Sequence, residues 1–229
     1  MTRLSRSSLL LTLGAVVALQ GCIPDYAPEF RARLVDANTG QPVEGSIVVA
    51  HWQILGGLEG GNPVGEAMVM ETVTDQAGSI YFPSWSRVSW KIGGIQNARP
   101  ELLAFKRGYK VLRLINESRP SFIDDLILRS DWNGKTLKLE GFEGNEQDYV
   151  KEIAWLDEFM HFSRWGRRCE WKQTPRMLVA IHKMRLEFES RGLYVATGTI
   201  HKATEVDDQS VCGTAQQFLQ PYLQEEPRK

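Results

Sequence analysis

The chain has no excess of charge of either sign and few cysteines. In 229 residues it carries 27 Lys and Arg against 28 Asp and Glu, and the basic residues are scattered along the sequence. A protein that binds the phosphates of nucleic acid needs a basic face, so nucleic acid is not expected as a partner. The three cysteines show none of the close spacings that are typical of zinc sites.

The sequence also lacks the short motifs that mark common catalytic sites. It contains no Gly-x-Ser-x-Gly elbow, no phosphate-binding loop, no Gly-x-Gly-x-x-Gly turn and no His-Glu-x-x-His pair. Two pairs of adjacent carboxylates, Asp124-Asp125 and Asp207-Asp208, have the oxygens that calcium prefers, but solvated loop acids or a helix N-cap are the favoured reading. The four histidines are scattered at His51, His161, His182 and His201. No catalytic residue, metal or cofactor is therefore predicted.

The N-terminal segment has the pattern of a signal peptide. Arg3 and Arg6 precede a run of apolar or small residues from Leu9 to Leu19, which gives a charged region followed by a hydrophobic one. A helix that spans a membrane needs about 20 apolar residues, so this run is too short to serve as an anchor. It ends in the four residues Leu19-Gln20-Gly21-Cys22.

These four residues resemble the lipobox of bacterial lipoproteins. The resemblance implies that residues 1–21 are removed by cleavage between Gly21 and Cys22, and that lipid on the Cys22 thiol then holds the protein to a membrane. An ordinary signal peptide with a chance cysteine, or a signal anchor, is the alternative. Because Ile23 and Pro24 follow the cysteine where Asp would favour the inner membrane, the resemblance indicates the outer membrane, facing the periplasm.

The part of the chain after Cys22 is predicted to be a short tether followed by β-strands. The tether is residues 22–29, which include two prolines. Short apolar runs separated by turn residues then predict strands. The glycine-rich Leu55–Gly65 is expected to form a flexible loop and Trp85–Pro100 an irregular stretch. The predicted strands are Phe30–Asp36, Ser46–Ile54, Met68–Thr74, Ser79–Phe82, Leu102–Lys106, Val111–Ile115 and Thr136–Leu139.

Two turn motifs in this β-rich part, together with a later Gly-Tyr segment, resemble the carboxypeptidase regulatory-like family. They are Asp36-x-x-Thr39-Gly40-x-Pro42-Val43, Thr74-Asp75-x-x-Gly78-x-Ile80-x-Phe82-Pro83 and Phe105-Lys106-Arg107-Gly108-Tyr109. The resemblance implies an antiparallel, transthyretin-like β-sandwich over residues 30–140. In the zinc carboxypeptidases that carry such a domain it is an accessory part, so the resemblance does not imply an enzyme.

From Asn145 onward the apolar residues recur with helical spacing. The two stripes are Tyr149, Ile153, Leu156, Met160 and Met177, Ile181, Met184, Phe188. Thr174-Pro175 is a typical helix start and Gly192 a typical end. A third helix is expected within Asp208–Leu223, containing Cys212 and ended or kinked by Pro221. The predicted class is thus α+β, an antiparallel β-sandwich followed by a small C-terminal helical region over residues 145–224.

Two cysteines remain if Cys22 is acylated. In an exported protein such a pair usually forms a disulfide, so a bond between Cys169 and Cys212 is predicted. Two buried free thiols are the alternative.

Seven tryptophans leave a second function open. Trp85, Trp90 and Trp132 fall in expected loops, where their rings could stack on a sugar, although packing in the core is the commoner role of tryptophan. The favoured function is a non-enzymatic cell-envelope lipoprotein that binds a further, unidentified envelope protein. A glycan or peptidoglycan binder is the alternative, and a hydrolase with a site assembled from dispersed residues is a third hypothesis.

Overall fold

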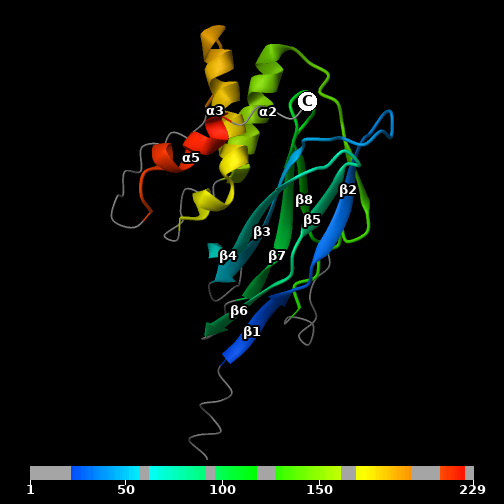
Figure 1. The fold of residues 1–229 in the computed structure, drawn as a ribbon, viewed down its shortest axis with the longest axis vertical. Helices are drawn as coiled ribbons and strands as arrows, with labels where there is room; N and C mark the ends of the chain where they lie inside the picture. The colour runs from blue at the N-terminus through cyan, green and yellow to red at the C-terminus, as the bar shows by residue number, and fades with distance from the viewer. Residues whose placement is uncertain are drawn as a thin grey trace, which may run out of the picture.

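The computed structural model in Figure 1 is an α+β protein whose helices follow the strands in the chain. It describes residues 22–56, 62–90, 96–117, 127–160, 169–196 and 212–224. The strands are β1 (Cys22–Ala27), β2 (Phe30–Asp36), β3 (Ile47–Gly56), β4 (Asn62–Val73), β5 (Ser79–Phe82), β6 (Trp85–Trp90), β7 (Gln96–Phe105), β8 (Leu112–Ile115) and β9 (Thr136–Leu139). The helices are α2 (Glu146–Phe159), α3 (Pro175–Ser190) and α5 (Ala215–Gln224), with a 3-10 helix (Glu170–Gln173) just before α3.

The strands form three sheets that are mostly antiparallel. Strands β1 and β6 make a two-stranded ribbon, the order β5-β2-β9 makes a three-stranded sheet, and the order β4-β3-β7-β8 makes a four-stranded sheet. Among the described pairs only β2 and β9 run parallel. The strands that the sequence predicts between residues 30 and 140 all form. The predicted ends are correct for Phe30–Asp36, Ser79–Phe82 and Thr136–Leu139 and shifted for the others.

Two segments that the sequence predicts to be irregular form strands instead. The ends of β3 and β4 extend into Leu55–Gly65, where Ile54 lies opposite Gly65 and Leu55 opposite Pro63. The stretch Trp85–Pro100 likewise contains β6 and the first half of β7. The ends of β3 and β4 pair with each other, whereas β6 and the first half of β7 pair with β1 and β3, strands that are distant in sequence and that the local composition does not reveal.

One hydrophobic cluster lies between the three-stranded and four-stranded sheets. Strand β3 contributes Val48, Ala50 and Trp52, whose spacing of two residues places them on the same face. In the three-stranded sheet, Phe30 of β2 lies opposite Phe82 of the neighbouring strand β5, and their rings stack with centroids 4.9 Å apart. These side chains are fully buried or nearly so, which makes this cluster the core of the β-rich part.

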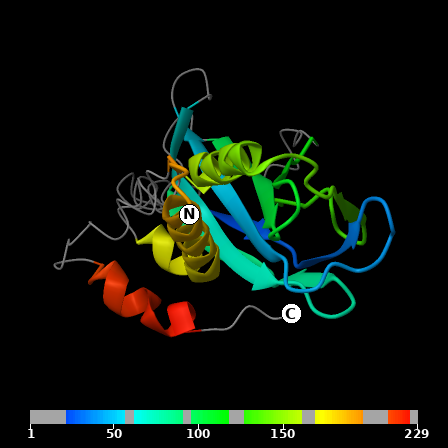
Figure 2. The same ribbon diagram turned by 90° about the horizontal axis from the view of Figure 1, so that it is seen from above.

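The other face of the four-stranded sheet is covered by the helices. Val49, Val69 and Leu103 on this face belong to one buried cluster with the apolar stripes that the sequence predicts for α2 and α3. Figure 2, which looks along the long axis, shows α3 and α5 on one side of the strands. The helical spacing in the sequence therefore identifies correctly which residues face the sheet. No helix within the described ranges is long and apolar enough to cross a membrane.

The helix ends differ in part from their predictions. Asn145 caps α2, because its Oδ1 accepts the Asp148 N–H at 2.9 Å. Thr174 precedes α3 as predicted, but its side chain makes no capping bond. Glu71 of β4 takes that role, since its carboxylate accepts the N–H groups of Arg176 and Met177 at 3.0 and 2.8 Å. A carboxylate is favourable there because it satisfies free donors at the positive end of the helix dipole.

The predictions for the third helix are resolved in one respect and corrected in another. Pro221 lies inside α5, which continues to Gln224, so of the two predicted effects it does not end the helix. Cys212 lies just before α5 rather than within it.

The first of the two turn motifs forms the tight turn that its residues predict. Asp36 Oδ1 accepts the N–H groups of Asn38 and Thr39 at 2.9 and 2.8 Å. The hydrogen bond from the Thr39 backbone is the largest cause of a lowered pKa at Asp36. Gly40 then adopts a φ of 69°, a left-handed conformation that costs glycine little.

The second turn motif depends more strongly on its glycine. Asp75 Oδ1 accepts the N–H groups of Ala77 and Ser79, and Gly78 has a φ of 72°. A Cβ on Gly78 would overlap the carbonyl oxygen of Leu34, a backbone atom that cannot move away without disturbing β2. Gly78 is thus required by conformation and by space.

Gly78→Ala should destabilise the protein far more than Gly40→Ala. Both alanines would adopt a left-handed conformation, which costs about 1–2 kcal/mol per residue. Only the alanine at Gly78 would also clash with backbone, because nothing lies within 4 Å of a Cβ at Gly40. Urea unfolding of the two variants measures the difference, and equal losses in the free energy of unfolding would contradict this account of the turn.

Candidate functional site

The residue predicted to carry lipid, Cys22, is the first residue of β1. This strand pairs with β6 in antiparallel register, with Cys22 opposite Trp90 and Ala27 opposite Trp85. The prediction that residues 22–29 form a tether is therefore wrong, since six of them form a strand. Pro24 suggests a tether because it lacks a backbone N–H, but a two-stranded ribbon has free edges that accommodate proline. Gly21, on the other side of the predicted cleavage point, lies outside the described residues.

Strand β1 is attached to the rest of the molecule by a buried ion pair. Asp25 is 1% exposed and lies directly opposite Arg87 of β6, whose Nη2 donates to Asp25 Oδ2 at 3.4 Å. One residue further on, the Tyr26 carbonyl accepts the N–H of Leu128 at 2.7 Å, and Ala27 is completely buried. From Asp25 onward the chain is thus part of the folded body.

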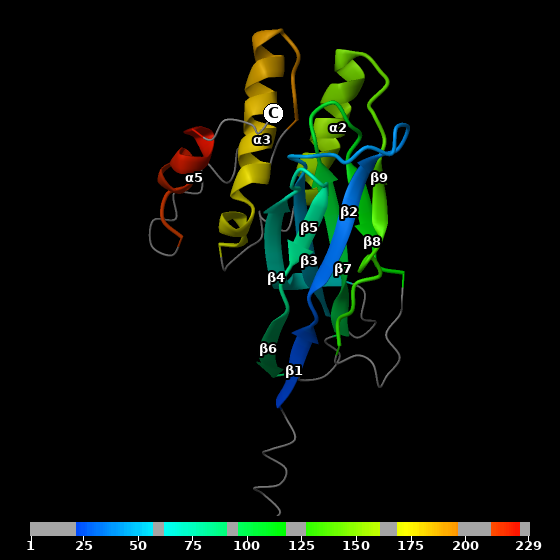
Figure 3. The same ribbon diagram turned by 45° about the vertical axis from the view of Figure 1, so that its right-hand side comes forward.

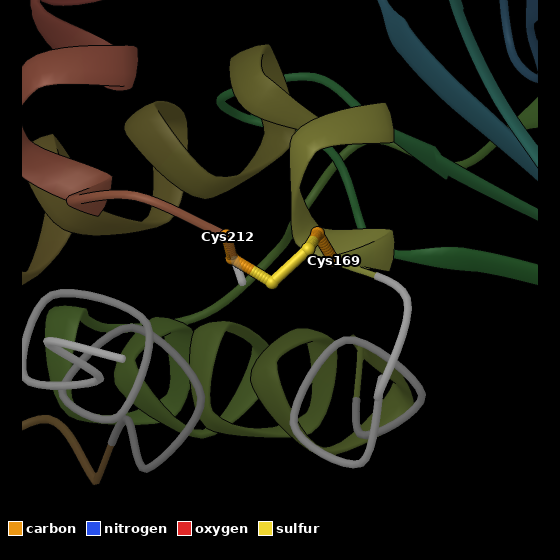
Figure 4. The surroundings of a disulfide bond; sticks show 2 residues. All are labelled: Cys169 and Cys212. Atoms are coloured by element: carbon orange, nitrogen blue, oxygen red, sulfur yellow. A yellow bond between two sulfur atoms is a disulfide. The ribbon is translucent and has the colours of Figure 1, made fainter. Parts of the chain in front are cut away.

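The two remaining cysteines form a disulfide, as predicted. Cys169 and Cys212 are bonded with their Cα atoms 5.6 Å apart, and Figure 4 shows the bond joining the chain before α3 to the chain before α5. The bond lies beside a buried aromatic contact, because Trp171 packs edge-on against Phe218 of α5 at 5.3 Å. It therefore fastens α5 to the rest of the helical part.

A buried polar cluster that the sequence analysis did not identify lies on the helix-covered face of the four-stranded sheet. We call His51, Glu66, Glu101 and Arg113 the His51 cluster. His51 Nδ1 is 3.2 Å from Glu66 Oε2, and His51 Nε2 is 3.7 Å from Glu101 Oε2. Arg113 of β8 forms an ion pair with the second oxygen of Glu101. The cluster links four adjacent strands, β4, β3, β7 and β8.

Polar partners explain how this face tolerates two carboxylates. Glu66 and Glu101 are 9% and 6% exposed, and isolated charges at such positions would be costly. The Arg113 guanidinium pairs with Glu101, and His51 Nδ1 lies within hydrogen-bond distance of Glu66. Arg113 also lies 4.6 Å above the ring of Phe159, so a residue of α2 covers the cluster's outer side.

The His51 cluster is best understood as structural. Its imidazole has no exposed surface, so a substrate has no access to it in this arrangement. Within the ranges that the structure describes, no group of three or more His, Cys, Asp or Glu side chains is arranged to hold a metal ion. The sequence carries only a faint signal for such a cluster. That signal is Glu101, an acidic residue directly before the apolar run Leu102-Leu103-Ala104-Phe105.

The tryptophans predicted to contact glycans are largely in the core. Trp85 and Trp132 are 6% and 5% exposed, and both belong to the cluster between the sheets. Trp85 packs edge-on against Trp52 at 5.4 Å, and Trp132 packs against Phe30 at 6.2 Å. The prediction that these two rings are free to stack on sugar is therefore wrong. The side chain of Trp90 lies outside the described part of the structure.

The other candidate groups do not assemble into a site. His182 is half-buried on α3, where desolvation is the main cause that lowers its pKa. His161 and His201, together with the carboxylate pairs Asp124-Asp125 and Asp207-Asp208, lie outside the described residues.

Comparison with known proteins gives no family for the chain. No protein-family model matches it, and no curated protein matches it in sequence. Partial structural matches include 3-chlorocatechol 1,2-dioxygenase from Rhodococcus opacus 1CP, with 15% identity over 52% of this chain and 61% of that chain and a TM-score of 0.30. The pilus 2b backbone protein of group B streptococcus matches with 17% identity over 50% of this chain and 41% of that chain, at a TM-score of 0.26.

A further match is chlorocatechol 1,2-dioxygenase from Pseudomonas putida, with 14% identity over 54% of this chain and 62% of that chain and a TM-score of 0.28. The chain thus spans less than two thirds of each of these proteins. At these low TM-scores the likeness carries no argument about function.

His51→Ala should strongly destabilise the protein. It would leave the buried Glu66 without its hydrogen-bond partner, and leaving a buried polar group unsatisfied costs about 1–3 kcal/mol, more for a charged group. His182→Ala is the matched control, because that histidine is half-buried on a helix and should change stability by less than about 1 kcal/mol. Chemical denaturation of both variants is the measurement. Similar small losses in the two would show that the cluster does not hold the sheet together.

Removing the disulfide should cost about 2–4 kcal/mol of stability, because the bond closes a long loop. The double variant Cys169→Ala/Cys212→Ala should remain folded in buffer but unfold at lower denaturant than the parent. Far-ultraviolet circular dichroism and tryptophan fluorescence measure the midpoint of unfolding. Cys22→Ser is the control, since Cys22 is not in the bond, and an unchanged midpoint in the double variant would contradict this prediction.

Proposed function

We propose that the chain is a lipoprotein of the bacterial cell envelope, anchored to a membrane by lipid on Cys22, with a body that binds other envelope components and is not an enzyme. The observation that carries the proposal is the sequence Leu19-Gln20-Gly21-Cys22 at the end of a short hydrophobic run. Cleavage before this residue would leave every strand and helix of the described residues intact.

An exported location is supported by the disulfide. Bonds such as the one between Cys169 and Cys212 persist in oxidising compartments and are rare in the reducing cytosol. Ile23 and Pro24 follow the acylated cysteine, and for that reason we place the protein in the outer membrane, facing the periplasm.

We further propose that the β-rich part is a transthyretin-like sandwich of the carboxypeptidase regulatory-like kind. Its support is the single hydrophobic cluster shared by the two larger sheets, and the two turns that form as their motifs require. Such a domain would present loops and helices for contact with a partner while its buried residues hold it rigid.

A binding role is favoured over catalysis by the state of the polar residues. The histidine that lies closest to carboxylates, His51, is buried between two of them. The glycan-binding alternative is weakened, because Trp85 and Trp132 lie in the core.

Cys22→Ser should release the protein from the membrane. Acyl chains on this thiol provide the attachment, since two or more chains anchor a protein stably where one binds only marginally. Fractionation of cells that make the parent and the variant, with mass spectrometry of the N-terminal peptide, is the test. Gly21→Ala keeps a small residue before the cleavage point and serves as the control that should remain anchored. An unmodified Cys22 in a soluble parent protein would overturn the proposal.

A further inference from the structure

The distance between the proposed lipid and the folded body is very short. Among the residues whose side chains the structure describes, Asp25 is the first in the chain and is buried, and three residues precede it back to Cys22. Even a fully extended chain spans at most about 3.3–3.6 Å per residue, so these residues reach about 11 Å. They are also paired with β6, with Ile23 opposite Ser89 and Pro24 opposite Val88. This pairing restricts how far Cys22 can move relative to the body.

The attachment point lies at one end of the long axis of the molecule. In Figure 1, where this axis is vertical, β1 begins at the lower end and the helices occupy the upper part. Figure 3 shows the same arrangement after a 45° turn, with the β1–β6 ribbon below the larger sheets and α2 and α3 above. The C-terminal half of α3 and the start of β1 are thus at opposite ends.

From these two observations we infer that the end of the body formed by the β1–β6 ribbon rests against the lipid surface, and that α2 and α3 point away from it. The inference rests on the proposed lipidation of Cys22 and adds the orientation of the body. A body joined to the bilayer by so short a link cannot turn its helical end to the lipid, because the link would have to span the length of the molecule.

The contacts of β1 make this orientation persistent. A flexible linker between the lipid and the body would let the body rotate freely. The end-to-end distance of such a linker grows with the square root of the number of its residues. Here the Asp25–Arg87 ion pair and the backbone bond between Tyr26 and Leu128 hold the strand to the body directly after the lipid. The helical end is consequently the surface presented to partners in the surrounding compartment.

The test uses the full lipidated protein in vesicles and compares two matched labels. Ser86 of β6 is exposed and lies opposite Tyr26, near the attachment point, whereas Ser190 is exposed at the far end of α3. Ser86→Cys and Ser190→Cys are each labelled with a thiol-reactive fluorophore, with the native disulfide kept oxidised. The vesicles contain phosphatidylethanolamine and phosphatidylglycerol with a quencher attached to the lipid headgroup, and flotation in a density gradient measures anchoring separately.

Quenching at Ser86 should be severalfold stronger than at Ser190 in protein that floats with the vesicles. Inserting about twelve Gly and Ser residues between Cys22 and Ile23, which span roughly 20 Å as a flexible chain, should abolish most of the quenching at Ser86 while flotation persists. Equal quenching at both sites in floating protein, or quenching that the insertion does not change, would overturn the orientation and leave the lipid anchor standing. Failure to float would overturn the anchor and the orientation together.

Discussion

Strand β3 is buried on both faces, and the other layers of the molecule are arranged around this requirement. Its residues alternate between the cluster that the two larger sheets share, which contains Val48, Ala50 and Trp52, and the cluster under the helices, which contains Val49. A strand with one apolar face needs a single covering layer, and a strand with two needs a layer on each side. The three-stranded sheet provides one cover, and α2 with α3 provides the other. The helical part is for this reason integral to the fold rather than an appendage to a β-rich part that is complete without it.

The polar groups on the helix-covered face follow from the same constraint. Glu71 faces the helices near the start of α3 and accepts two of its free N–H groups, which ties that helix to β4. Further along the same face, His51 lies between Glu66 and Glu101, and Arg113 pairs with Glu101 beneath Phe159. Each of these buried carboxylates therefore has a helix end or a polar side chain as its partner, as the low dielectric of an interior demands. A carboxylate at either place would be strongly unfavourable without its partner.

Local patterns in the sequence predict the features that depend on local physics. The turns at Asp36–Gly40 and Asp75–Gly78, the apolar stripes of α2 and α3, and the start of α3 at Pro175 arise from interactions within a few residues. The features that the sequence does not predict all depend on distant partners. Strand β1 exists because β6 pairs with it, and Trp85 and Trp132 are buried because the sheets close over them. The His51 cluster requires the register of three strand pairs, which no single segment encodes.

Two parts of the molecule are held by different kinds of interaction. In the helical part the covalent bond between Cys169 and Cys212 restrains α5, and it does so only while the compartment is oxidising. Strand β1 is held by backbone hydrogen bonds to β6 and by the Asp25–Arg87 pair, neither of which depends on redox conditions. A reducing environment would thus loosen α5 and leave β1 in place, so the part nearest the proposed lipid stays attached under conditions that weaken the helical part.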